Sequence, residues 1–96
     1  MTTNQAITSE FGTTTFNGKV YILTSAADYT SRLLPGGYTN YVDAVEGDEY
    51  EFEMSASAVY EDGVEYTVYW IFSDTKGDEA PLDAYDYSTA DRVQPS

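Results

Sequence analysis

A regular alternation of residue types over residues 49–72 most constrains how this chain can fold. Within residues 49–60, acidic, serine and valine side chains occupy the odd positions, and aromatic, methionine and alanine side chains occupy the even ones. Because successive side chains of a β-strand point to opposite faces, this pattern predicts a strand with one apolar and one polar face. Residues 64–72 repeat the alternation, so the two segments predict the arms of one long β-hairpin.

The loop between the arms decides which residues face each other. A two-residue turn at Asp62-Gly63 would mix the apolar face of one arm with the polar face of the other. A three-residue loop, residues 61–63, with Gly63 in the left-handed position of a bulge, instead pairs Tyr60 with Val64. Since a slip of one residue would turn a whole arm inside out, we predict the three-residue loop. The resulting pairs are Phe52 with Phe72, Met54 with Trp70, and Ala56 with Val68.

The segments before this hairpin predict a second hairpin and a short helix. Asn17-Gly18 lies between two β-prone segments in residues 11–24 and is a residue pair that type I′ hairpin turns favour. Ser25 can cap the start of a helix of two turns, which Pro35-Gly36-Gly37 would end. Residues 38–45 fit either a helical stripe or a strand, and their Thr, Tyr and Val content favours the strand.

The whole sequence predicts a single, mostly β domain over residues 1–96. We expect four to five antiparallel strands in a curved sheet or a small open barrel, together with one short helix. Residues 1–10 are expected to be a loose lead-in with a short edge strand near Ile7. Residues 78–96 could pack along the sheet or form a partly ordered extension, and residues 88–96 could be loose.

The absence of two residue types limits the chemistry open to this chain. It contains no Cys and no His, so it lacks disulfides, thiolate ligands, the most common general base and the most common metal ligand. We therefore expect neither an enzyme nor a protein that carries a cofactor. The N-terminal segment has no basic start and no apolar run, and no stretch approaches membrane-spanning length. These features predict a cytoplasmic protein without a membrane partner.

Charge is distributed unequally along the chain. The sequence has 17 acidic and 4 basic residues, a formal net charge of −13. Residues 1–42 are neutral, whereas residues 43–91 contain 15 acidic residues and one base, Lys76. An asymmetry of this size indicates a charged partner. Direct nucleic-acid binding is not expected, since it requires Lys and Arg to neutralise phosphates.

Catalysis and calcium binding are two other roles that carboxylates can perform. Glu51 and Glu53 are neighbours on one strand face, but an open strand provides no pocket that would shift a catalytic pKa. Residues 43–49 hold four carboxylates without the alternating ligand order and terminal glutamate of an EF-hand loop. Solvated surface charge explains both groups, and no metal site is expected.

Three apolar or aromatic side chains share the predicted carboxylate face of the hairpin: Val59, Tyr69 and Ile71. Aromatic residues are enriched in the cores of protein interfaces, so Tyr69 could anchor a partner. The C-terminal tail could equally cover all three. The sequence leaves both possibilities open.

The polar face of the hairpin places carboxylates at a spacing that suits a polyanion. Alternate strand residues recur every ~6.6–6.8 Å, so Glu49, Glu51 and Glu53 form a regular ladder. B-DNA carries one negative charge per ~1.7 Å of axis, so the net charge of −14 in residues 43–91 matches about 24 Å of duplex. The candidate partner-binding residues are this ladder, the acidic residues that could flank or extend it, and one aromatic: Asp43, Glu46, Asp48, Glu49, Glu51, Glu53, Glu61, Asp62, Glu65, Tyr69, Asp74, Asp78, Glu79, Asp83 and Asp86.

In size, acidity, lack of Cys and His, and the ladder over residues 49–53, the chain resembles the acidic DNA-mimic proteins of phages and mobile elements. These include anti-CRISPR and anti-restriction proteins. The resemblance implies an inhibitor that occupies the basic DNA-binding surface of a defence nuclease or effector complex, such as a CRISPR effector or a restriction enzyme, or of another DNA-binding protein. If the protein is phage-encoded, it would act in the cytoplasm of the bacterial host, as a monomer or a homodimer.

One alternative function remains open from the sequence. The chain could be an acidic structural or interaction module of a phage or mobile element that binds a basic protein without imitating DNA. Either function requires a basic protein or complex as the partner, because the acidic residues of the chain are concentrated in residues 43–91.

Overall fold

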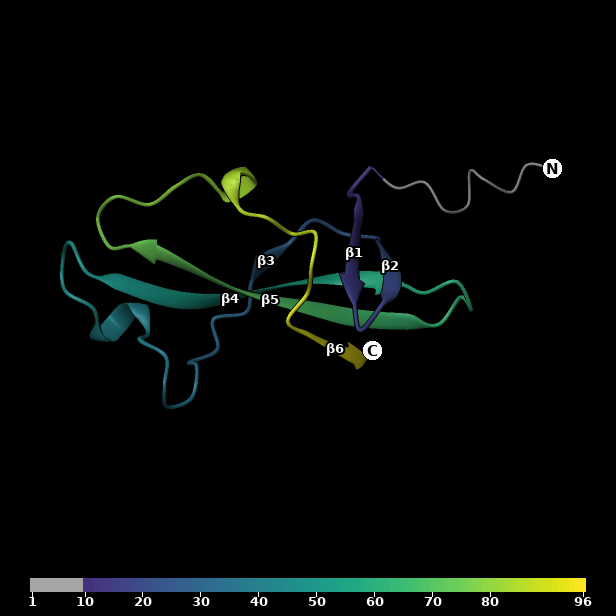
Figure 1. Cartoon of the computed structure of the whole chain (residues 1–96), viewed down its shortest axis with the longest axis horizontal. Helices are drawn as coiled ribbons and strands as arrows, with labels where there is room; N and C mark the ends of the chain where they lie inside the picture. The colour runs from purple at the N-terminus through teal and green to yellow at the C-terminus, as the bar shows by residue number, and fades with distance from the viewer. Residues whose placement is uncertain (1–9) are drawn as a thin grey trace.

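A long antiparallel hairpin of two 11-residue strands forms the axis of the molecule (Figure 1). The computed structural model describes residues 10–96. Strand β4 spans Glu49–Val59 and strand β5 spans Glu65–Thr75. The register confirms the predicted pairs Phe52 with Phe72, Met54 with Trp70 and Ala56 with Val68.

The loop that joins β4 to β5 has the predicted three residues. Gly63 has a φ of +80°, the left-handed conformation that glycine adopts without strain. Its N–H donates to the carbonyl oxygen of Tyr60 at 2.8 Å, and the N–H of Tyr60 donates to the carbonyl oxygen of Val64 at 3.2 Å. The loop therefore fixes the register that separates the apolar face from the polar face.

A second hairpin packs on the first through its later strand. Strand β1 spans Thr13–Phe16 and β2 spans Lys19–Leu23. Asn17 and Gly18 have φ values of +53° and +76°, so both central residues of the turn are left-handed, as the predicted type I′ turn requires. Strand β2 then pairs with the far end of β4, from Ile22 to Val59 and from Leu23 to Ala58.

Two short strands complete a six-stranded antiparallel sheet in the described residues. Strand β3, Asp28–Tyr29, pairs with β4, and β6, Arg92–Pro95, pairs with β5. The strand order is β1-β2-β4-β5-β6, with β3 beside β4, and the sheet does not close. One isolated parallel bridge, Thr15 with Thr89, links β1 to the chain just before β6. The structure is thus mostly β, as the sequence predicts.

The core lies on the apolar face of the hairpin, where the aromatic side chains gather. Trp70, Met54 and Val68 have no exposed surface. The indole N–H of Trp70 donates to the carbonyl oxygen of Tyr87 at 3.0 Å and approaches the Thr14 hydroxyl at 3.3 Å, so the buried donor is satisfied. The ring of Tyr87 meets that of Trp70 edge-on, with 5.1 Å between centroids. These contacts join β1 and the C-terminal segment to the hairpin.

The predicted helix after Ser25 is wrong. Residues 25–30 run extended along the edge of β4 and form β3 there. The backbone N–H of Ser57 donates to the Ser25 hydroxyl at 3.0 Å, so Ser25 binds the neighbouring strand instead of capping a helix. Hydrogen bonds to an existing strand edge outweigh the weak helical preference of this segment.

The predicted strand over residues 38–45 is also wrong. This segment contains a single turn of 3-10 helix, η2, at Tyr41–Asp43. The ammonium group of Lys76 donates to the carbonyl oxygens of Tyr41 and Ala44 at 3.0 and 2.8 Å. These bonds satisfy carbonyls that a strand would have paired within the sheet.

The C-terminal segment packs along the sheet, which is one of the two arrangements that the sequence leaves open. A 3-10 turn, η3, spans Leu82–Ala84, and the Tyr87 hydroxyl donates to the carbonyl oxygen of Leu82 at 2.8 Å. The chain then joins the sheet as β6. No helix in residues 10–96 combines the length and apolar composition that crossing a membrane requires. The predicted edge strand near Ile7 lies outside the described residues.

Replacing the buried indole tests this description of the core. We expect Trp70→Ala to lower the free energy of unfolding by about 3–5 kcal/mol, because it leaves a cavity and removes the bonds to Tyr87 and Thr14. Tyr29→Ala, at a ring that is 55% exposed, should cost far less. Urea unfolding of both variants measures the difference, and similar losses would contradict a core centred on Trp70.

Candidate partner-binding surface

Seven of the predicted acidic site residues gather at one end of the long hairpin. They lie at the start of β4, the end of β5 and the loops attached to them, where antiparallel pairing brings Tyr50 opposite Asp74. This end is at the left of Figure 1. We call this group the acidic pole; its members are Asp43, Glu46, Asp48, Glu49, Asp74, Asp78 and Glu79.

Backbone hydrogen bonds hold the two loops of the acidic pole together. The N–H of Gly47 donates to the carbonyl oxygen of Lys76, and the N–H of Lys76 donates to that of Asp48, both at 2.9 Å. The Glu46 carboxylate lies so close to Gly77 that a Cβ at this glycine would overlap it. The exposed Glu46 side chain could move aside, so it is the φ of +90° at Gly77 that favours glycine there.

Two carboxylates of the acidic pole also bind side chains of the fold. Asp74 accepts hydrogen bonds from the Tyr85 hydroxyl and from the N–H of Ala80, which keep the pKa of Asp74 below its usual value. Glu79 accepts from the Tyr50 hydroxyl at 3.2 Å. Burial, with the nearby Glu79 charge second, raises the pKa of Tyr50 to about 12. These two acids position loops; Asp74 is half-buried, whereas Glu79 and the other five members of the pole are exposed.

The remaining predicted acids lie elsewhere on the molecule. Glu61, Asp62 and Glu65 surround the loop at the opposite end of the hairpin, and we call them the acidic tip. Ten residue steps of β4 at ~3.4 Å each separate the pole from the tip by about 34 Å. Asp83 and Asp86 lie on the C-terminal segment around η3. Apart from Glu51 and Glu53, the structure therefore divides the predicted acids into three groups.

Glu53 is buried, so its assignment to an exposed carboxylate ladder is wrong. Its side chain is 1% exposed and lies against Thr30, Arg32 and Arg92. Arg32 donates to it through Nε at 3.0 Å and a terminal nitrogen at 2.8 Å, and Arg92 donates at 3.1 Å. The Thr30 hydroxyl adds a bond at 2.9 Å. Hydrogen bonding from Arg32 is the main reason that the pKa of Glu53 falls to about 2.

The other two rungs of the ladder differ from each other. Glu51 is half-buried and accepts a hydrogen bond from the N–H of Thr39 at 2.8 Å. Glu49 is exposed and belongs to the acidic pole. Only one of the three predicted rungs is thus a fully exposed carboxylate.

Tyr69 is half-buried, and two side chains of the C-terminal strand contact it. The guanidinium of Arg92 lies 3.8 Å from the centre of the Tyr69 ring. The Tyr69 hydroxyl donates to Oε1 of Gln94 at 3.3 Å. Of the two possibilities that the sequence leaves open, contact with the C-terminal segment is the one observed for Tyr69.

All four basic side chains of the chain are engaged within the fold. Arg32 and Arg92 share Glu53. Lys76 binds two carbonyls and lies 4.2 Å from the centre of the Tyr41 ring, and Lys19 lies 5.6 Å from that of Tyr60. Glu53 is the acid in both ion pairs of residues 10–96, so the other 16 carboxylates of the sequence have no cationic partner there.

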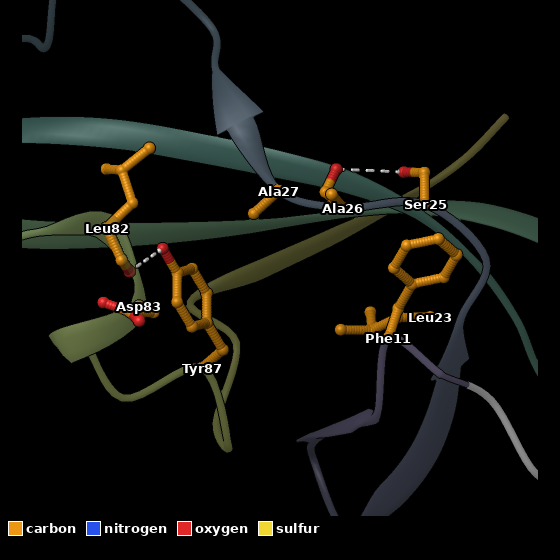
Figure 2. Close-up of a pocket in the computed structure, with 8 residues that line it drawn as sticks. All are labelled: Phe11, Leu23, Ser25, Ala26, Ala27, Leu82, Asp83 and Tyr87. Atoms are coloured by element: carbon orange, nitrogen blue, oxygen red, sulfur yellow. Dashed lines mark hydrogen bonds between the residues drawn. The ribbon is translucent and has the colours of Figure 1, made fainter.

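The described residues line several pockets on the surface. One, of about 270 Å³, lies between Phe11, Leu23 and Tyr87 (Figure 2), and Asp83 is its one carboxylate. Another, of about 300 Å³, lies over Glu53 and its two arginines. Within residues 10–96, no three acidic side chains are arranged to hold a metal ion.

Comparisons with protein-family models, with curated proteins and with solved structures find no match to this chain.

Neutralising Glu53 tests whether it is a structural group. We expect Glu53→Gln to lower the free energy of unfolding by about 3 kcal/mol at pH 7, because a depression of the pKa from 4.5 to about 2 corresponds to that energy. Folding lowers this pKa, so the stabilisation is complete above pH 4.5 and is lost as the pH falls through 2.

The difference between wild type and Glu53→Gln should therefore stay constant from pH 7 to 5 and shrink toward pH 2. The other carboxylates are common to both proteins and cancel in this difference. Denaturant unfolding at several pH values measures it. A variant as stable as wild type at pH 7 would contradict the structural role of Glu53. Glu49→Gln is the matched control and should leave stability unchanged or raise it, since Glu49 is exposed among like charges.

Proposed function

We propose that this protein binds the basic surface of another protein through its acidic pole, at a surface that otherwise binds DNA. The target class is the DNA-binding surface of a defence nuclease or effector complex, such as a CRISPR effector or restriction enzyme, or of another DNA-binding protein. The observation that carries the proposal is the engagement of all four cations within the fold, which leaves 16 carboxylates unpaired by cations in the described residues.

The cost of this charge distribution supports a binding role. A net charge of about 2–8 in magnitude is ample for the solubility of a small domain, and this chain carries −13. Like charges held together destabilise a fold through mutual repulsion. Six exposed carboxylates at one pole, with Lys76 already bound to carbonyls, are therefore unfavourable in isolation. A basic partner surface would remove that repulsion and would be steered to the pole at a higher rate.

The distance between the acidic pole and the acidic tip supports an imitation of DNA at these two places, and not along the whole molecule. A duplex as long as β4, about 34 Å, would carry about 20 charges, more than this entire chain. The acidic pole and the acidic tip are, however, about 34 Å apart, which is close to one helical turn of B-DNA. A protein that grips phosphates one turn apart would meet carboxylates at both ends of the hairpin.

The alternative, an acidic interaction module that binds a basic protein without imitating DNA, is favoured by one observation. Glu53 is buried and paired with Arg32 and Arg92, so β4 carries no continuous row of exposed carboxylates. The two functions differ in whether the target can hold DNA and this protein together.

Competition with DNA distinguishes the two functions. The immobilised protein should capture its target from a bacterial lysate at low salt and release it as salt rises, because the attraction is electrostatic. We expect a 30-base-pair duplex to displace the purified target, and this protein to displace the duplex from it. Formation of a ternary complex with DNA would rule out mimicry and leave the alternative function.

Charge reversal at two positions provides the matched control for this experiment. The double variant Glu49→Lys, Asp78→Lys should weaken target binding by about tenfold or more while remaining folded. The double variant Glu10→Lys, Asp28→Lys changes the net charge equally but lies outside the acidic residues 43–91, and it should bind nearly as well as wild type. Equal losses in both variants would show that only net charge matters and would contradict binding through the acidic pole.

A further inference from the structure

Large apolar side chains are exposed beside the acidic pole. Leu33, Tyr41 and Val42 are 65%, 50% and 70% exposed. All three line one hollow of about 320 Å³, together with the half-buried ring of Phe52 and with Glu51. We call this hollow the edge groove. Apolar side chains that gather at the surface mark interaction sites, whereas single ones need no explanation.

The edge groove exists because the chain leaves the edge of β4 and returns to it. The N–H of Thr30 donates to the carbonyl oxygen of Glu53 at 3.2 Å, and the N–H of Glu51 donates to that of Thr39 at 2.7 Å. Residues 31–38 pass outward between these two contacts, as the lower loop in Figure 1 shows. Leu33 lies in this loop and lines the groove together with Tyr41 and Val42 of the η2 turn.

Hydrogen bonds hold both walls of the groove in place before any partner binds. The N–H of Leu34 donates to Oδ1 of Asn40 at 2.7 Å, and the Asn40 amide donates back to the carbonyl oxygen of Leu34 at 3.1 Å. Lys76 binds the carbonyls of Tyr41 and Ala44 in the other wall. A groove with fixed walls loses little conformational freedom on binding, which favours affinity.

The charges around the groove define what can enter it. Asp43 of the acidic pole directly follows Val42, and the pole includes three more acids within residues 46–49. Arg32 also lines the groove, but its guanidinium is paired with the buried Glu53. An apolar side chain flanked by lysine or arginine residues would match both the apolar lining and the acidic border.

We propose that the edge groove receives one large apolar side chain from the basic partner, as the anchor around which the acidic pole makes its charge contacts. This inference rests on the proposed binding of a basic protein. The groove, at about 320 Å³, is large enough for such a side chain, since a cavity of about 150 Å³ accepts benzene. Anchors of this kind, a large side chain in a pocket surrounded by weaker contacts, contribute most of the affinity at protein interfaces.

Two synthetic heptapeptides test the anchor separately from the charge. One has a tryptophan between three lysines on each side, and the other has alanine in place of tryptophan. Calorimetric titration at low salt should show both binding, with the tryptophan peptide about tenfold tighter because its ring becomes buried. Equal affinities would overturn the groove and leave the proposed function intact. Absence of binding by both peptides would overturn both.

Substitutions in the edge groove test whether the tryptophan of the peptide binds there. Leu33→Ser and Val42→Ser should each reduce the tryptophan advantage to about twofold or less and leave the alanine peptide unchanged. Val20→Ser is the matched control, because Val20 is 53% exposed on β2, outside the groove, and it should retain the full advantage. Thermal unfolding checks that each variant folds. Retention of the advantage in both groove variants would contradict the proposed site.

Discussion

The register of the β4–β5 hairpin is the constraint on which the rest of the structure depends. One loop residue in the left-handed conformation, Gly63, sets that register. Because odd and even strand positions lie on opposite faces, the register then places these side chains. Met54 and Trp70 meet in the core. Glu53 lies on the other face, where two arginines bind it. The same pairing brings the start of β4 against the end of β5, and so assembles the acidic pole from residues about 30 positions apart in the sequence. A slip of one residue would undo all of these contacts together.

The placement of the cations links this fold to a function. A buried carboxylate is costly unless it is paired and hydrogen-bonded, and here Glu53 takes both arginines of the chain. Each of the two lysines lies over a tyrosine ring, and Lys76 also donates to two carbonyls. The fold thus uses its positive charges for internal structure. The exposed carboxylates, and the apolar groove that borders them, remain for a partner of the opposite charge.

The sequence predicts those features that depend on local pattern. Two-residue alternation and the positions of Gly63 and Asn17-Gly18 are sufficient for both hairpins and for the register of the longer one. The sequence does not predict what the polar face of the hairpin meets. Nothing in the residues around Glu53 indicates that Arg32 and Arg92, 21 and 39 positions away, will bind it. The Ser25 segment and residues 38–45 fail as predictions for the same reason, since β4 and Lys76 supply hydrogen-bond partners that are distant in sequence. The sequence shows the acidic composition, but the fold is needed to divide it into the pole, the tip, the pair Asp83 and Asp86, and the buried Glu53.

Carboxyl-to-lysine cross-linking of the protein to its captured target tests the central claim most directly. A carbodiimide joins a carboxylate to a lysine only where the two are in contact, so the cross-linked residues map the bound surface. The acidic pole and tip should carry the cross-links, with Asp48, Glu49 and Asp78 prominent among them, and Glu53 should carry none because it is buried. Cross-links at Glu10 and Asp28 as often as at the pole would contradict the account, since the partner would then recognise net charge and not the surface that the hairpin builds.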